Sequence, residues 1–162
     1  MAETKKFSLA VGGDHAGFPM KGGIIEFLRA EGHEVEDCGS YDAAPVDFPD
    51  ITRAVCDRVR NGRAQRGILV CGTGVGACIA ANKVPGIRAS VCHDIYSAHQ
   101  CVEHDDVNVV AIGAQIVGIK TAEDCLRAFL NTEFSTEKQF RIRVSKLADM
   151  ERRAAAEFSP KP

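Results

Sequence analysis

The segment from Arg66 to Lys83 limits the possible folds of this chain more than any other. It begins with the apolar run Ile68-Leu69-Val70 between glycines, which is typical of a short buried strand. Cys71 and the glycines at positions 72, 74 and 76 follow, and then a predicted helix of small residues from Ala77 to Lys83. Glycines at a strand-to-helix junction allow the backbone to turn tightly. The segment therefore predicts one unit of an α/β fold.

The same segment has the composition of a ligand site. Backbone N–H groups in the turn and the N-terminus of the following helix favour an anion or a developing oxyanion. A helix N-terminus also lowers the pKa of a cysteine, so Cys71 is predicted to favour its thiolate form. A lone cysteine in a strand is more often a packing residue. The turn is neither a GxGxxG nor a GxxxxGK[ST] motif, but it lies where open α/β sheets bind ligands.

The rest of the chain alternates between predicted strands and helices. Strands are expected at about 7–13, 34–39, 68–70, 88–94 and 107–113, and helices before Gly32 and at about 50–61, 77–83, 95–103, 119–130 and 136–157. This alternation predicts a Rossmann-like three-layer sandwich with a five-stranded parallel sheet in the order 2-1-3-4-5. We expect one domain over residues 1–162, with a core at about 7–150 and a C-terminal helical arm at about 136–157.

Composition excludes several classes of function. The 20 basic and 22 acidic side chains give a formal charge of −2, so no nucleic-acid partner is indicated. The sequence has neither the apolar run of a membrane span nor the apolar segment of a signal peptide. The cysteines are an odd number, 7, without CxxC or metal-ligand spacing. We therefore expect a cytoplasmic protein with reduced thiols, no metal site and no membrane association.

Polar residues at strand ends indicate where the site lies. Asp14-His15, the segment from Cys71 to Gly76, and His93-Asp94 all follow strands, so they should share one rim of the sheet. His104-Asp105-Asp106 precedes the fifth strand, which places it at the opposite rim of its own subunit. It can meet Cys71 only through a loop that turns back or across a dimer interface. We expect an active site shared between subunits, with the charged C-terminal helix as an arm onto the neighbour.

The sequence over about residues 7–150 also resembles that of a known family. The matching segments are Asp14-His15-Ala16-Gly17, Asp47-Phe48-Pro49-Asp50, Cys71-Gly72-Thr73-Gly74-Val75-Gly76, Ile79 to Ala89, His104 to Asn108, and Gly118. In them the chain is similar to the ribose-5-phosphate isomerase B family, which includes the galactose-6-phosphate isomerase subunits. The resemblance implies the five-stranded fold, a homodimer or dimer of dimers, and no metal or organic cofactor.

The resemblance further implies an aldose–ketose isomerase, an intramolecular oxidoreductase that works through a cis-enediolate. Cys71 would be the base, and the backbone of Gly72, Gly74, Val75 and Gly76 would form the oxyanion hole. By the same resemblance Thr73 would contact the reacting oxygens, His104 would open the furanose ring, and Asp14 and His15 would bind hydroxyls or phosphate.

Simpler structural roles remain open for several of these side chains. His104 could be a surface histidine in a turn, Asp14-His15 an N-cap, and His93-Asp94 a structural turn. His33 and His99 are expected to be ordinary surface residues, and Cys78 is expected to pack against the sheet.

The chain departs from the family pattern where phosphate is expected to bind. Gln115 and Gln139 replace basic residues, Asp105 replaces an asparagine, and Arg143 is the one retained arginine of the C-terminal motif. Glutamine cannot replace a guanidinium charge, although Lys138, Arg141 or Lys146 could compensate. Ribose 5-phosphate and ribulose 5-phosphate are the leading substrate pair. The alternatives are a tetrulose 4-phosphate or hexose 6-phosphate, and a non-catalytic sugar-phosphate-binding subunit.

Overall fold

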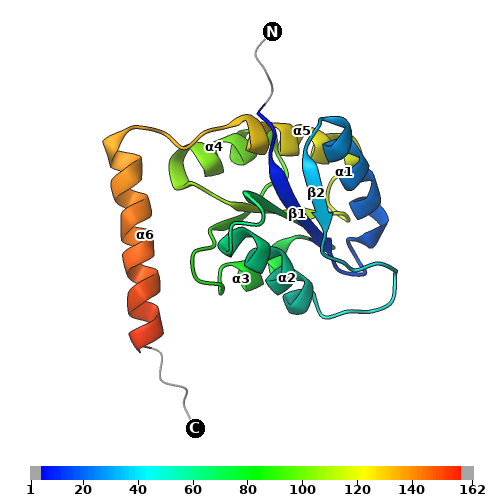
Figure 1. Ribbon diagram of the computed structural model, residues 1–162, viewed down its shortest axis with the longest axis horizontal. Coiled ribbons are helices and arrows are strands. Elements are labelled where there is room, and N and C mark those ends of the chain that lie inside the picture. The colour runs from blue at the N-terminus through cyan, green and yellow to red at the C-terminus, as the bar shows by residue number, and fades with distance from the viewer. Residues whose placement is uncertain (1–4, 158–162) are drawn as a thin grey trace.

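The computed structural model describes residues 5–157 and forms an α/β fold around one parallel sheet (Figure 1). The strands are β1 (Ser8–Gly13), β2 (Glu34–Asp37), β3 (Arg66–Cys71), β4 (Ala89–Val91) and β5 (Val109–Gly113). The helices are α1 (Phe18–Ala30), α2 (Phe48–Arg60), α3 (Val75–Ala81), α4 (Ile95–Asp105), α5 (Ile119–Asn131) and α6 (Lys138–Glu157). In this part of the chain, no helix has both the length and the apolar character needed to span a membrane.

The strand order is β2-β1-β3-β5-β4, so the expected order 2-1-3-4-5 was wrong for the last two strands. Strand β5 pairs with β3 along its whole length, from Gly67 with Val109 to Cys71 with Gly113. Every residue of β5 is buried, whereas the three residues of β4 are all half-buried. An apolar strand is stabilised most between two neighbours and two helix layers, which explains why β5 takes the inner position. The short β4 forms the edge.

Helices cover both faces of the sheet (Figure 1). Helices α2 and α3 pack on one face, and α1, α4 and α5 pack on the other. Side chains alternate along β3, so Ile68 and Val70 enter the core beneath α1, α4 and α5. Leu69 and Cys71 point to the α2 and α3 side. The alternation therefore gives Cys71 a buried position at the last residue of its strand.

Helix α6 lies along the side of the molecule beyond α4 (Figure 1). The Phe140 ring of α6 stacks on the His104 ring. The Glu151 carboxylate, also on α6, accepts a hydrogen bond from the Gly86 N–H at 3.0 Å. None of the described side chains of α6 is buried, and Leu147 and Met150 are 43% and 65% exposed. The expected C-terminal helix is present, and one face of it lacks cover within the described chain.

Candidate active site

The first group of site residues lies at the carboxyl ends of β1, β3 and β5. Asp14 follows β1, Cys71 ends β3, and Gln115 follows β5. Hydrogen bonds from the Ala114 N–H to the Cys71 carbonyl oxygen, at 2.8 Å, and from the Gln115 N–H to the Gly72 carbonyl oxygen, at 3.0 Å, join the last two segments. This is the edge at which parallel sheets bind ligands.

The central contact of this group joins Cys71 to Asp14. The thiol lies 3.2 Å from Asp14 Oδ2, and the Asp14 side chain is buried. The other carboxylate oxygen, Oδ1, accepts a hydrogen bond from the Gly17 N–H at 2.9 Å. Gly17 permits this arrangement because a Cβ atom there would lie 1.9 Å from the Val70 carbonyl oxygen. The start of α1 therefore approaches the end of β3 closely enough to fix the carboxylate beside the thiol.

These surroundings raise the pKa of Cys71 above the ordinary value of a thiol. Burial is the largest cause, and the hydrogen bond to Asp14 is the next. Hydrogen bonding from the backbone of Gly74 and Gly72 acts in the opposite direction but is outweighed. The expectation of a lowered pKa was therefore wrong: in the resting protein the Cys71 thiol is protonated and donates a hydrogen bond to the Asp14 carboxylate.

The turn after Cys71 adopts the shape that its glycines allow. Gly74 has a φ of 81°, in the left-handed region that side chains disfavour. Thr73 is exposed, and its Oγ1 accepts a hydrogen bond from the Val75 N–H at 3.3 Å. Helix α3 begins at Val75, two residues earlier than expected, so Val75 and Gly76 form its first turn. A Cβ atom on Gly72 would lie 3.2 Å from Gln115 Oε1, which places the Gln115 side chain against the turn.

The histidines of this rim have different surroundings. His15 is exposed, and its Nδ1 accepts a hydrogen bond from the Val46 N–H at 3.3 Å. His93 Nε2 accepts from the Gly113 N–H at 2.8 Å, and Asp94 caps α4 through the Ser97 N–H at 2.7 Å. The structural role expected for His93 and Asp94 is therefore confirmed. Cys78 packs as expected, with Sγ 3.4 Å from the Ala89 carbonyl oxygen.

The second group of site residues lies at the other end of the sheet. His104 is in the last turn of α4 rather than in a loop, and its ring stacks on Phe140 with the centroids 4.0 Å apart. The Arg143 guanidinium lies 5.5 Å from the centre of the Phe140 ring. Gln139 is exposed and donates to Glu137 Oε2 at 2.6 Å. Sequence reasoning missed Phe140, because no local pattern shows that α6 folds back onto the end of α4.

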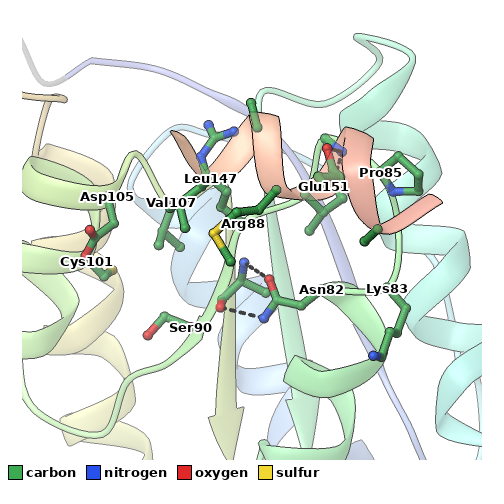
Figure 2. Close-up of a pocket in the computed structure, with 16 residues that line it drawn as sticks. Asn82, Lys83, Pro85, Arg88, Ser90, Cys101, Asp105, Val107, Leu147 and Glu151 are labelled. Carbon is green, nitrogen blue, oxygen red and sulfur yellow. Dashed lines mark hydrogen bonds between the residues drawn. The ribbon is translucent and has the colours of Figure 1, made fainter. Parts of the chain in front are cut away.

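Asp105 lies beside a groove of about 970 Å³ between α6 and the segment 82–90 (Figure 2). Leu147 and Glu151 of α6 face Asn82 and Arg88 across this groove (Figure 2). The Asn82 amide donates to the Ala89 carbonyl oxygen and accepts from the Ala89 N–H, both at 2.9 Å. Arg88 is paired with Asp106 at 2.7 Å. Asn82 and Arg88 therefore shape the groove while their own polar groups are satisfied.

One chain does not bring the two groups together. His104 lies before β5 and Gln115 lies after it, so the strand separates them. Five residues of β5, from Val109 to Gly113, span about 13 Å at ~3.3 Å per residue. Cys71, which pairs with Gly113, and His104 are thus at opposite ends of the sheet.

The fold and the first group of residues define a Rossmann-like protein with a buried thiol–carboxylate pair beside a glycine-rich turn. The chain belongs to the ribose/galactose isomerase family, which it matches over residues 9–147. It is 42% identical over 130 residues to the D-erythrulose-4-phosphate isomerase of Pectobacterium atrosepticum, covering 78% of this chain and 84% of the relative. It is also 42% identical over 126 residues to ribose-5-phosphate isomerase B of Escherichia coli, covering 78% and 85%.

A solved structure supports the same assignment. Ribose-5-phosphate isomerase B of Clostridium thermocellum superposes with a TM-score of 0.88 at 41% identity, over 92% of this chain and 99% of that one. The chain is therefore a member of a family of sugar-phosphate isomerases with this fold.

Proposed function

We propose that this protein is an aldose–ketose isomerase of a sugar phosphate, with D-ribose 5-phosphate and D-ribulose 5-phosphate as the leading substrate pair. The observation that carries the proposal is the Cys71 thiol held 3.2 Å from the buried Asp14 carboxylate, next to the glycine-rich turn that leads into α3. Membership of the ribose/galactose isomerase family supports the reaction class. No step of the proposed chemistry requires a metal or an organic cofactor.

In the proposed reaction Asp14 accepts the thiol proton of Cys71, and the resulting thiolate removes the proton from C2 of the open-chain aldose. A cis-enediolate forms, the hydroxyl proton of O2 passes to O1, and Cys71 returns its proton to C1 to give the ketose. Asp14 then returns the thiol proton to Cys71. Backbone N–H groups of Gly72, Gly74, Val75 and Gly76, with the Thr73 hydroxyl, would bind the developing oxyanion. His15 would bind substrate hydroxyls or phosphate from the same rim.

Opening of the furanose ring is assigned to His104 of a second subunit. Two observations support a shared site in a homodimer or dimer of dimers. His104 and Cys71 lie at opposite ends of one chain, and α6 exposes apolar side chains that a neighbour would cover. Asp105, Gln139 and Arg143 would then approach the Cys71 rim together with His104.

The phosphate end of the substrate is where the alternatives differ. Gln115 and Gln139 carry no charge, so the cations considered for the phosphate are those of the first half of α6: Arg143, Arg141, Lys138 and Lys146. A tetrulose 4-phosphate or a hexose 6-phosphate is the second candidate, and the similarity to a D-erythrulose-4-phosphate isomerase favours the first of these. A non-catalytic binding subunit is disfavoured, because it would have no need for the Cys71–Asp14 pair.

The deciding experiment is a turnover screen of the wild-type protein and two variants. The substrates are ribose 5-phosphate, allose 6-phosphate, erythrose 4-phosphate, erythrulose 4-phosphate and the unphosphorylated sugars. Cys71→Ala should abolish turnover, while Cys78→Ala, which removes the packed thiol of α3, should retain it. Full turnover by Cys71→Ala would remove Cys71 as the base. A folded wild-type protein that converts no sugar phosphate would contradict the isomerase proposal.

A further inference from the structure

A buried ion pair joins α1 to the end of β2, at the edge of the sheet that holds the first group of site residues. Lys21 of α1 is 3% exposed, and its Nζ donates a hydrogen bond to Asp37 Oδ1 at 2.5 Å. Asp37 is the last residue of β2. Burying a lysine is costly unless its charge is paired, so the position of Lys21 depends on Asp37. None of the chemistry proposed above uses either residue.

Asp37 also fixes the start of the loop between β2 and α2, residues 38–47 (Figure 1). Its Oδ1 atom accepts a second hydrogen bond, from the Gly39 N–H at 2.9 Å. The Gly39 carbonyl oxygen accepts from the Gly13 N–H at 2.7 Å, and the Ser40 N–H donates to the Gly13 carbonyl oxygen at 2.6 Å. The ion pair therefore holds the first residues of this loop against the end of β1.

Hydrogen bonds inside the loop connect its start to the His15 ring. Ser40 Oγ donates to the Asp42 carbonyl oxygen at 2.7 Å, and Asp42 Oδ1 accepts from the Ala44 N–H at 2.9 Å. Two residues further on, the Val46 N–H donates to His15 Nδ1 at 3.3 Å. The loop is thus attached to the end of β1 at its start and to His15 near its end.

The bond from Val46 determines the form of the His15 ring. Because Nδ1 accepts a hydrogen bond, it carries a lone pair, so the ring is neutral and its hydrogen is on Nε2. The His15 side chain is exposed, and within residues 5–157 its Nε2 has no hydrogen-bond partner. The ring nitrogen available to a substrate is therefore a hydrogen-bond donor.

We propose that Lys21 and Asp37 are positioning residues that, through the loop 38–47, hold His15 as a neutral Nε2–H donor to an oxygen atom of the substrate. This inference rests on the proposed isomerase function, in which His15 binds a hydroxyl or phosphate oxygen. Both kinds of oxygen accept hydrogen bonds. Without the ion pair the loop can leave the end of β1, and the Val46 N–H then no longer fixes the form and orientation of the ring.

The first experiment removes both charges of the ion pair at once. The double variant Lys21→Met, Asp37→Ala leaves no unpaired buried charge, so it should remain folded, which urea unfolding checks. Its KM for ribose 5-phosphate should rise about 2- to 10-fold, the range for one hydrogen bond, with little change in kcat. Asp37→Asn, whose amide oxygen can still accept from the Gly39 N–H, should give a smaller rise. It carries the same measurements if the double variant does not fold.

The matched control removes an ion pair from the other face of the same strand. Arg58 of α2 donates to Glu36 Oε1 at 3.0 Å, and Glu36 is the residue before Asp37. Successive side chains of a strand point to opposite faces, so this pair lies on the α2 side of the sheet. Arg58→Met, Glu36→Ala should therefore leave the KM for ribose 5-phosphate at the wild-type value.

A double-mutant cycle with His15 tests whether the ion pair acts through this ring. His15→Ala should raise the KM for ribose 5-phosphate at least as much as the loss of the ion pair does. Adding Lys21→Met and Asp37→Ala to His15→Ala should then raise the KM no further, because the donor that the pair positions is already absent. Effects that add in full would overturn the proposal, since the pair would then act on binding without His15.

Nitrogen-15 NMR of the His15 ring in the free protein provides a readout that needs no substrate. At mildly alkaline pH, where an ordinary imidazole is neutral, the Nε2–H form should be the only one detected in the wild-type protein. The double variant Lys21→Met, Asp37→Ala should show a mixture of the two neutral forms.

The other outcomes separate the inference from the function on which it rests. An unchanged KM in the double variant, or an equal rise of KM in the Arg58 and Glu36 control, would overturn the positioning role and leave the isomerase proposal standing. A ring signal that is the same with and without the ion pair would also overturn it. A wild-type protein that converts no sugar phosphate would contradict the proposed function itself, while the NMR comparison would still show whether the ion pair fixes the His15 ring.

Discussion

At the scale of single residues, Asp14 has two opposing effects on Cys71. Its negative charge and hydrogen bond raise the pKa of the thiol, which keeps Cys71 protonated in the resting protein. The same carboxylate, 3.2 Å away, is the nearest acceptor for the proton when the thiolate is needed. Proton transfer within the pair needs no exchange with solvent. The wild-type rate should therefore vary little with pH around neutrality.

Asp14→Asn should separate these two effects. Removing the carboxylate removes a cause of the raised pKa, so the pKa of Cys71 should fall. The internal proton acceptor is lost as well, and turnover at neutral pH should decrease at least about 100-fold. The remaining rate should rise with pH as the thiol ionises into solvent. Rate profiles against pH, with alkylation of Cys71 by iodoacetamide measured against a Cys71→Ala background, provide the measurement. A variant with the wild-type rate at neutral pH would remove Asp14 from the mechanism.

Gln115 and Gln139 provide a second prediction at this scale. Gln115 lies against the Cys71 turn, and Gln139 is exposed on α6 beside Phe140. The double variant Gln115→Arg, Gln139→Arg should lower the KM for ribose 5-phosphate, because guanidinium groups bind phosphate bidentately. The KM for unphosphorylated ribose is the control and should not change. An unchanged KM for the phosphate ester would place the phosphate elsewhere, for example near Arg141.

At the scale of elements, the junction between β1 and α1 sets the geometry of the site. Gly17→Ala would place a Cβ atom 1.9 Å from the Val70 carbonyl oxygen, so either α1 or β3 must shift. We expect a loss of about 1–3 kcal/mol in the free energy of unfolding and a weakened Cys71–Asp14 contact with reduced turnover. Gly22→Ala, inside α1 with nothing within 4 Å of the added atom, is the control.

The free energy of unfolding of the Gly22→Ala control should increase by up to about 1 kcal/mol, because alanine has the higher helix propensity. Urea unfolding of both variants provides the measurement. Equal free energies of unfolding for the two variants would show that the close approach of Gly17 to Val70 does not restrict the residue at position 17.

The sequence predicted the elements of this fold well where a periodic apolar pattern was strong. Val55 and Val59 on α2 and the apolar residues of β5 are examples. The order of β4 and β5 was predicted wrongly because strands that follow each other in the sequence were assumed to be neighbours in the sheet. The apolar sequence of β5, which indicates an inner strand, was given less weight. His33 was expected at the surface, yet it is buried, and its Nδ1 accepts from the Phe7 N–H at 3.2 Å. Burial and the nearby Lys6 lower the pKa of His33.

The location of the candidate site at one edge of the sheet could be predicted from the sequence, but the contacts between its side chains could not. Parallel strand ends must meet at one edge, which brings Asp14 and Cys71 into the same region. Their direct contact joins residues 57 positions apart and depends on the close approach at Gly17, which has no local signature. The stacking of His104 on Phe140 likewise depends on the path of the chain before α6. Propensity reports local conformation, whereas these contacts depend on tertiary packing.

At the scale of the whole molecule, the proposed shared site predicts complementation between inactive subunits. Cys71→Ala and His104→Asn should each abolish turnover of ribose 5-phosphate, but a mixed dimer would contain one intact site. After unfolding and refolding an equimolar mixture, about a quarter of the wild-type activity should return if two-fold symmetric dimers assort randomly. The separately refolded variants are the control. No recovery in mixtures that contain mixed dimers by mass measurement would contradict a site shared in this way.

The inner position of β5 also affects the order in which the chain can fold during synthesis. When β4 leaves the ribosome, the strand that must separate it from β3 has not yet been made, so β3 has one partner and β4 has none. The sheet can be completed only after Gly113 emerges, and the pairing of Gly67 with Val109 then joins residues far apart in the sequence. Such long-range contacts slow folding. Until then the nascent chain exposes the apolar side of β3, and we expect its productive folding to be completed after most of the chain has been translated.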